Sequence, residues 1–449
     1  MIRRLLARLM PGRPAREPRI YAAGDHPVRR EQVARSARTV VEKLHEAGFK
    51  AFVVGGAVRD LMLGLTPKDF DIATDATPEQ VKPLFRRAYV IGRRFRLVHV
   101  HVGADVLEVS TFRAAQNAQD STDEHGRLLS DNVYGSQAED AARRDFTINA
   151  LYFDPSSEEV WDYVGGVVDI RARRLKLIGP PVTRYREDPV RMLRAVRLAA
   201  KAGLAIDSKT AAPIPKLATL VSNVPPARLF DEMQKLLLSG HAAETLASLR
   251  AHGLSHGLLP LLDVILEQPL GPRFIEVALA STDARVREGK PVSPAFLFAT
   301  LLWHEVLQQW TAAKSKGERT IPALYDAMDR VLEAQAARIS IPRRFEATIK
   351  EIWALQPRFE QRAGQRPYRL LEHERFRAAY DFLSLRAESG EAPKALVDWW
   401  TRFQEAPQAE REAMLRPDEA PRKTRRSRGR GRKRREDDEP GSPSSNDTE

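Results

Sequence analysis

Two aspartates, Asp69 and Asp71, flank Phe70 in the stretch VVGGAVRDLMLGLTPKDFDIATD, which begins with an apolar run. On a β-strand, residues two apart point to the same face, so both carboxylates are predicted to project together while Phe70 faces the core. Like charges aimed at one point oppose each other's ionisation, and a divalent cation between them removes that cost. Because magnesium prefers hard oxygen ligands and keeps positions for water and phosphate, the pair predicts a Mg²⁺ site.

A pair of glycines, Gly55 and Gly56, ends the apolar run and opens a predicted helix that contains Arg59. Bare backbone N–H groups at the start of a helix, together with the helix dipole, receive phosphate. The dinucleotide pattern G-x-G-x-x-G is absent, so the glycines indicate a phosphate site beside the metal site instead of a dinucleotide fold. A plain tight turn is the alternative for the glycines alone, as a surface turn is for the D-x-D alone.

The composition restricts the class of protein. A chain of 449 residues, 43% of them hydrophobic, is long enough for two or more domains. It has no cysteine, which excludes disulfides and thiolate zinc sites and leaves oxygen and histidine as metal ligands. The net charge of +12 lies at the ends: residues 1–38 carry +7, residues 422–435 carry +10, and residues 39–421 carry +1. Basic ends predict phosphate binding to nucleic acid, with a solvated tail that only aids solubility as the alternative.

The hydrophobic pattern changes once along the chain. Short apolar runs alternate with helical stretches up to residue 175, which predicts an α/β head, a small mixed sheet with flanking helices. Ala- and Leu-rich helical periodicity follows, which predicts an all-α neck and body. The expected parts are a basic, partly disordered arm, the head, the neck, the body, and a disordered basic then acidic tail (1–38, 39–175, 176–270, 271–410 and 411–449). The polar stretch 114–136 predicts a mobile loop beside the head.

Three further stretches contain charged residues, namely EVSTFR with Glu108, RRDFTINALYFD with Arg143, Arg144 and Asp145, and YREDPVRMLRAVRLAAKAG with Asp188, Arg191, Arg194 and Arg197. Planar guanidinium groups suit ribose and phosphate oxygens, although the two arginines of the second stretch could also form a solvated helix face. In the third stretch, the acid before Pro189 has the form of a helix N-cap followed by an N1 proline. The three arginines behind it, each three residues apart, form a basic stripe on that helix.

In this order, the glycine pair, the D-x-D and the later stretches resemble the nucleotidyltransferase superfamily of bacterial poly(A) polymerases and CCA-adding enzymes. The resemblance runs from about residue 25 to about residue 406. It implies a head that binds ATP and Mg²⁺, a helical neck that reads the base, and a helical body that holds RNA. It also implies two metal ions, one that lowers the pKa of the RNA 3′-hydroxyl and one that neutralises the triphosphate.

The resemblance assigns roles to single residues. Asp69 and Asp71 are expected to bridge the metals, and Asp145 is favoured as the third active-site carboxylate, with Glu108 on a neighbouring strand in reserve as a metal ligand. The structural alternative for Asp145 is a salt bridge with Arg143 or Arg144. The residues expected to bind the nucleotide in the head are Gly55, Gly56, Arg59, Arg143 and Arg144.

The helix after residue 188 is expected to read the base. In the family, the matching acid and arginine form hydrogen bonds to the incoming base, which assigns Asp188 and Arg191 to base selection. Capping is the alternative for Asp188. Arg194 and Arg197 are expected at the nucleotide site too, with pairing to head carboxylates as the alternative.

The segment IGRRFRLVHV (91–100) and the basic tail resemble bacterial poly(A) polymerases in particular. We therefore expect template-independent addition of AMP from ATP to RNA 3′ ends, held largely without sequence preference, which promotes RNA decay together with decay proteins. The alternatives are a CCA-adding tRNA nucleotidyltransferase and, more distantly, a non-catalytic RNA-binding scaffold. The sequence contains no apolar run of about 18 residues and no signal-peptide pattern, so we expect a cytoplasmic protein without a membrane span.

Overall fold

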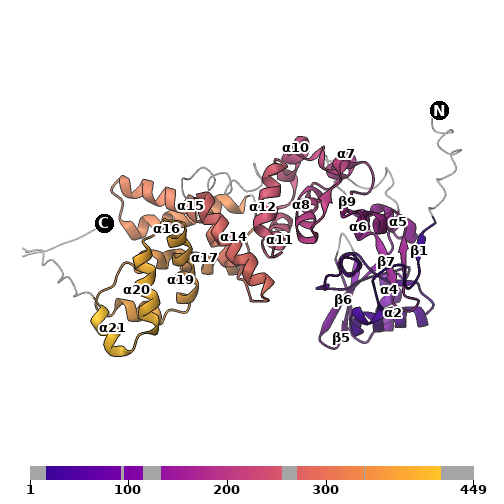
Figure 1. The fold of residues 1–449 in the computed structure, drawn as a ribbon, viewed down its shortest axis with the longest axis horizontal. Coiled ribbons are helices and arrows are strands. Elements are labelled where there is room, and N and C mark those ends of the chain that lie inside the picture. Colours follow the sequence, from indigo (N-terminus) through magenta and orange to yellow (C-terminus); the bar gives the residue numbers. More distant parts are fainter. Residues whose placement is uncertain (1–16, 93–95, 115–132, 255–270, 338, 416–449) are drawn as a thin grey trace, which may run out of the picture.

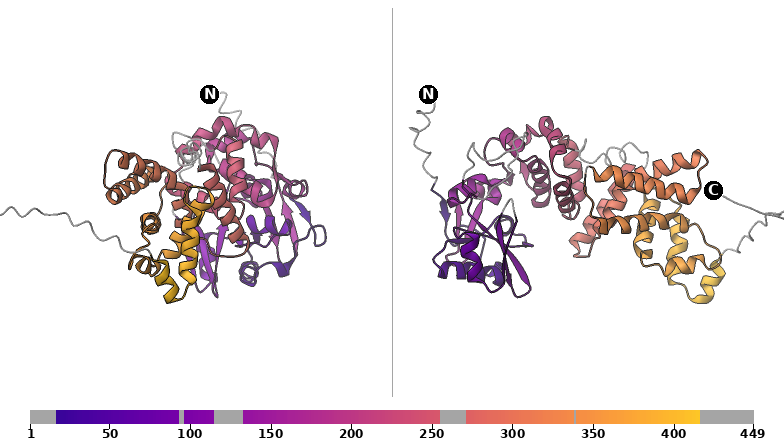
Figure 2. Two further views of the ribbon diagram at one scale, coloured as in Figure 1. Left: turned by 60° about the vertical axis from the view of Figure 1, so that its left-hand side comes forward. Right: turned by 180° about the vertical axis from the view of Figure 1, so that it is seen from behind.

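The structure is a computed structural model that describes residues 17–92, 96–114, 133–254, 271–337 and 339–415. An α/β head, a helical neck and a helical body follow one another along the long axis (Figure 1). The same order is visible from behind (Figure 2). This confirms the predicted fold class. Within the described residues, no helix is both long and apolar enough to cross a membrane.

The head is built on a mixed sheet of eight strands in the order β1-β8-β7-β2-β3-β6-β5-β4. β3 and β6 pair in parallel, and the other neighbours pair antiparallel. The strands are β1 (Arg19–Tyr21), β2 (Ala51–Val54), β3 (Asp71–Thr74), β4 (Ala88–Ile91), β5 (Leu97–Val102), β6 (Asp105–Thr111), β7 (Leu151–Asp154) and β8 (Glu159–Asp162). The head helices are α2 (Arg35–Glu46), α3 (Gly56–Met62), α4 (Pro78–Val81), α5 (Gln137–Arg143) and α6 (Gly166–Arg171).

Both faces of the central strands are buried, which is why β2 reads as a continuous apolar run. Val53 and Ile72 belong to the large core that also contains side chains of α2. Phe52 and Ala73 point to the other face, into a smaller core with Ala141 of α5. Because α5 covers this second face, its C-terminal end and the residues that follow it lie near the start of β3.

Two boundaries differ from the sequence-based expectation. The arm expected at 1–38 is folded from residue 19 on, since β1 pairs with β8 and both Val28 and Val33 are buried in the head core. Residues 1–16 lie outside the described residues, as do 115–132 of the expected loop and 416–449 of the expected tail. The body extends past residue 410, because α21 (Gln408–Met414) and Leu415 continue it and Leu415 packs on a body core.

The described residues of the neck and the body are helical, apart from the short strand β10 (Ala205–Ile206), which pairs in parallel with β9 (Arg174–Leu175) at the end of the head. The neck helices are α7 (Pro181–Glu187), α8 (Val190–Ala202), α9 (Ser208–Ala211), α10 (Ile214–Leu217), α11 (Pro226–Leu237) and α12 (Ala242–Ala251). The body helices before α21 are α14 (Gly271–Arg287), α15 (Pro294–Ser315), α16 (Thr320–Ala336), α17 (Arg343–Leu355), α18 (Arg366–Leu371), α19 (Phe376–Glu388) and α20 (Lys394–Glu405).

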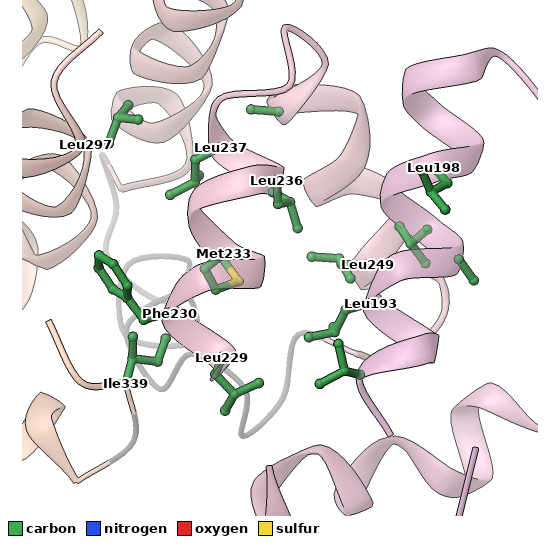
Figure 3. Packing of buried hydrophobic residues seen from close by; sticks show 14 of the residues in the cluster. Leu193, Leu198, Leu229, Phe230, Met233, Leu236, Leu237, Leu249, Leu297 and Ile339 are labelled. Carbon is green, nitrogen blue, oxygen red and sulfur yellow. The ribbon is translucent and has the colours of Figure 1, made fainter. Parts of the chain in front are cut away.

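Helix α11 is fixed on two sides. Its apolar residues include Leu229 and Leu236, which lie toward Leu193 of α8, whereas Phe230 on the opposite side lies toward the body (Figure 3). The ring of Phe230 stacks on that of Phe298 in α15, with centroids 5.2 Å apart. These contacts leave the polar residues of α11 facing the junction with the head.

A second core closes the far end of the body. Trp400 in α20 is fully buried, and its Nε1 donates a hydrogen bond to the Phe359 carbonyl oxygen at 2.9 Å. The ring of Trp399 stacks on Phe403 with centroids 4.7 Å apart. Both tryptophans therefore pack within the body.

Candidate active site at the junction of head and neck

Asp71 is the first residue of β3 and lies beside β6 and the N-terminus of α3. The parallel pairing of Ile72 with Val109 places Asp71 next to Glu108 on β6. Gly55, whose φ is +71°, lies on the other side, and a Cβ built there would be 3.9 Å from Asp71 Oδ2. Because L side chains rarely adopt this φ, and because the atom would also approach Arg144 at 3.6 Å, the site favours glycine at position 55.

Burial and the nearby charge of Glu108 raise the pKa of Asp71 to about 6, and Asp69 also contributes to the increase. The carboxylate remains reachable by water, yet the protein around it reduces its hydration. The positive charges of Arg144 and Lys235 act in the opposite direction but do not cancel the increase. The acidic side chains at this point therefore repel one another in the absence of a cation.

Asp69 lies two residues before the first residue of β3, so it is not on a regular strand as the sequence predicted. The predicted alternation still holds, since Phe70 packs against the head core and Ile72 is buried in it. Both aspartates are exposed. The loop position of Asp69 leaves its carboxylate freer to move than a strand residue would be.

Metal binding at this point has chemical support but no preformed cage. Among the described residues, no three His, Cys, Asp or Glu side chains are gathered closely enough to hold a metal ion. The ligands are nevertheless of the right kind. The carboxylates of Asp69, Asp71 and Glu108 repel one another and contribute to the raised pKa of Asp71, and a divalent cation would relieve this repulsion. The residues present thus fit a hard divalent cation.

Arg144 is fixed beside Asp71 by the second face of the sheet. Its Nε donates to Asp140 Oδ2 and to the Tyr152 hydroxyl, each at 3.1 Å, and its guanidinium lies over the Tyr152 ring. Tyr152 in turn donates to the same Asp140 oxygen at 2.6 Å. Arg143 instead donates to the Ala114 carbonyl oxygen at 2.6 Å. The two arginines therefore point to different places, and Arg144 is the one near the carboxylates.

Asp145 is held in an ion pair, and its partner is Arg194 instead of Arg143 or Arg144. Arg194 donates from Nε and from a terminal nitrogen to Asp145 Oδ2, at 2.9 and 2.6 Å. The other oxygen accepts hydrogen bonds from Phe146 N and Asn149 Nδ2. Burial alone would raise the pKa of Asp145, but the charge of Arg194 and these hydrogen bonds hold it well below its usual value.

Arg59 lies beneath the site. It is 5% exposed, and its guanidinium donates to Asp60 Oδ1 at 2.6 and 2.8 Å and to Asn149 Oδ1 at 2.7 Å. Asn149 also contacts Asp145, so a chain of hydrogen bonds through Asp60, Arg59, Asn149, Asp145 and Arg194 links α3 of the head to α8 of the neck. In this structure Arg59 thus contacts protein groups, and its expected contact with the nucleotide stays a prediction.

Asp188 does not cap α8, whose N-cap residue is Pro189 and has no side-chain cap. Its two oxygens accept hydrogen bonds from two terminal nitrogens of Arg228 in α11, at 3.0 and 2.7 Å. Arg191 donates to the Arg184 carbonyl oxygen at 2.9 Å and to Glu187 at 3.1 Å. Arg197 pairs with Glu232 of α11 at 2.6 Å, and among the described residues it forms no ion pair with a head carboxylate.

A pocket of about 420 Å³ opens between these groups, a volume within the range of small-molecule sites, about 300–1,000 Å³. Head, α8 and α11 all contribute to its lining, which consists of Asp145, Asp188, Val190, Arg191, Arg194, Arg228, Asp231, Glu232 and Lys235. The structure therefore brings Asp145 and the expected base-selecting pair to one cavity. Asp71 and Glu108 lie on the sheet, Gly55 precedes α3 and Asp69 precedes β3, and none of these four residues lines the pocket.

The contribution of α11 to the pocket was not predicted from the sequence. Arg228, Asp231, Glu232 and Lys235 follow the spacing i, i+3, i+4 and i+7, which places them on one face of the helix. That polar face on a helix otherwise rich in leucine was the available signal. Nor was the role of Arg184, which donates to the carbonyl oxygens of Arg143 and Arg144 at 2.6 and 2.8 Å and so fixes the end of α5.

Comparison with known proteins places this arrangement. Family models match the poly A polymerase head domain at residues 51–176, the probable RNA and SrmB-binding site of polymerase A at 203–266, and the polymerase A arginine-rich C-terminus at 316–436. A solved tRNA-processing enzyme in its apo form shares the fold with a TM-score of 0.55 and 22% identity, over 85% of this chain and 97% of that chain.

Curated relatives separate two branches. Poly(A) polymerase I of Escherichia coli is 46% identical over 91% of both chains. A CCA-adding enzyme of Bacillus pumilus is 39% identical over 44% of this chain and 48% of its own length. These similarities place the chain in the nucleotidyltransferase superfamily that contains both activities. Within it, the chain belongs to the poly(A) polymerase family, and it is a polynucleotide adenylyltransferase.

Proposed function

We propose that this chain adds AMP from ATP to RNA 3′ ends at the junction of head and neck, with Mg²⁺ as the divalent cation. Asp69 and Asp71 would hold the metal, and Glu108 would complete its carboxylate ligands. When bound, the metal supplies an acidified 3′-hydroxyl and neutralises charge on the departing pyrophosphate. The raised pKa of Asp71 beside Glu108 supports this choice, because a cation removes the repulsion that causes it.

Asp145 then acts as a positioning residue. Both of its oxygens already accept hydrogen bonds, from Arg194 on one and from Phe146 N and Asn149 on the other. A metal would have to displace the guanidinium of the half-buried Arg194 to reach Asp145, which would break a charge pair at a cost in free energy. We therefore infer that Asp145 fixes α8 against the head, and through α8 the orientation of the base-reading residues.

The base is proposed to enter the pocket beside Asp188 and Arg191. Arg228 holds the Asp188 carboxylate in one plane by a bidentate contact, and Glu187 and the Arg184 carbonyl oxygen restrain Arg191. Fixed acceptors and donors discriminate between bases better than mobile ones, because a mismatched base leaves buried polar groups unpaired. Arg144, Gly55 and Gly56 lie on the metal side, where the phosphates of ATP are expected.

RNA is proposed to be held without sequence preference, by phosphate contacts from the basic residues of the ends on a nearly neutral body. A polymerase of this kind would mark transcripts for decay in the cytoplasm and work beside decay proteins. The observation that carries the proposal is the extent of similarity. It covers 91% of both chains for poly(A) polymerase I and less than half of either chain for the Bacillus pumilus CCA-adding enzyme.

A primer-extension experiment tests this function. Purified protein, Mg²⁺ and each nucleoside triphosphate in turn are offered an unstructured RNA and a tRNA that lacks its terminal triplet. We expect a long ladder with ATP alone on the unstructured RNA, and none with the Asp69→Ala/Asp71→Ala variant. Addition restricted to C and A on the tRNA would instead assign the chain to the CCA-adding branch.

A further inference from the structure

The charges that line the pocket are mostly paired already. Arg194 is paired with Asp145, and Arg228 is paired with Asp188. Arg191 contacts Glu187, and Glu232 is paired with Arg197. The cations and anions of these pairs compensate each other within the protein, so they offer little net charge to a ligand.

Lys235 differs from them. It lines the pocket from the polar face of α11 and is exposed. Among the described residues, no carboxylate lies within the 4.0 Å ion-pair distance of its Nζ. Asp231, one helical turn earlier, also lines the pocket, yet the two do not form an ion pair in this structure. Among the described cations that line the pocket, Lys235 is thus the one whose charge is not compensated by an ion pair.

The position of Lys235 lies between two parts of the site. On one side it shares a cavity with Asp188 and Arg191, the proposed base-selecting pair. On the other side its charge acts on Asp71, at the proposed metal site on the sheet. A nucleotide whose base lies at the first place and whose reacting phosphate lies at the second must pass this lysine.

We propose that Lys235 binds the triphosphate of the incoming ATP, so that α11 of the neck supplies a phosphate ligand to the head. The proposal deepens the proposed function and rests on it. A lysine ammonium is a compact point charge on a flexible stem, suited to follow phosphates as they move during transfer. Helix α11 packs on Leu193 of α8 (Figure 3). Its Phe230 stacks on Phe298 of α15, so Lys235 extends from a helix that is held on both sides.

Equilibrium binding of adenosine, AMP, ADP and ATP without RNA tests the proposal. We compare wild type with Lys235→Met, which keeps the length of the side chain and removes its charge. The exposed Lys216 of α10, substituted as Lys216→Met, is the matched control. Loss of a charged contact should weaken ATP binding about tenfold and leave adenosine binding unchanged. Lys235→Arg should restore most of the ATP affinity.

Three outcomes would overturn the proposal. An equal loss for adenosine and ATP would show that Lys235 shapes the base pocket. Unchanged ATP binding, together with weaker RNA binding in a separate titration of the same variants, would assign the lysine to an RNA phosphate. Unchanged binding of all ligands would give it no part in recognition. Failure of the proposed function is distinguishable, because wild type itself would then add no AMP to RNA.

Discussion

The ion pair between Asp145 and Arg194 joins the head to the neck, and Arg194→Met removes it. The substitution deletes two charge-assisted hydrogen bonds to Asp145 Oδ2, at 2.9 and 2.6 Å, and leaves a carboxylate whose side chain is 13% exposed. Breaking a buried pair costs about 3–5 kcal/mol. Because Phe146 N and Asn149 still donate to the other Asp145 oxygen, we expect Arg194→Met to lower the free energy of unfolding by about 2–3 kcal/mol.

Urea unfolding of the full chain, followed by circular dichroism, measures this loss against Arg250→Met, an exposed arginine of α12. The double variant Asp145→Asn/Arg194→Met should recover about 2 kcal/mol of the summed single losses, because no unpaired charge then remains. Asn keeps the acceptor for Asn149. Additive losses would refute the claim that this contact joins the two domains.

The lowered pKa of Asp145 also predicts how the difference in free energy of unfolding between wild type and Arg194→Met depends on pH. A carboxylate with a depressed folded-state pKa stabilises the protein fully above its unfolded pKa of about 4 and loses this contribution as pH falls toward the folded value. The difference between wild type and Arg194→Met should therefore be constant from about pH 6 to 8 and shrink below about pH 4.

Three other predictions concern the site. Burial and Glu108 raise the pKa of Asp71 to about 6, from 3.8 when unfolded, so the metal-free wild type should lose stability as pH rises between these two values. Melting curves in chelator should show that the Asp71→Asn variant becomes more stable relative to wild type over the same pH range. Arg228→Ala frees the Asp188 carboxylate and should lower kcat/KM for ATP by about tenfold while relaxing the preference over CTP, as competition assays would show. Deleting 416–449 should weaken RNA binding at about 0.15 M salt and flatten its salt dependence without abolishing AMP transfer; equal slopes would contradict the role of the tail.

Much of the head could be predicted from the sequence, because its signals are local. The apolar run that forms β2, the glycine pair before α3 and the alternation around Phe70 each depend on neighbouring residues. The capping box at α4 is of the same kind, with Thr77 N donating to Gln80 at 2.8 Å.

Local sequence patterns could not predict which residues distant in the sequence form ion pairs or pair as strands. The partner of Asp145 stands 49 residues later in the sequence and that of Asp188 stands 40 residues later, so no local spacing identifies Arg194 or Arg228. The N-terminal boundary was wrong for the same reason. β1 is fixed by its pairing with β8, far along the chain, while its basic composition resembles that of an unfolded arm.

A crystal structure with a non-hydrolysable ATP analogue and Mn²⁺, located by its anomalous signal, would test the central claim most directly. We predict the metal on Asp69 and Asp71, the adenine between Asp188 and Arg191, and the ion pair of Asp145 with Arg194 intact. A metal bound to Asp145 with Arg194 displaced, or an adenine outside the pocket beneath α11, would contradict the account.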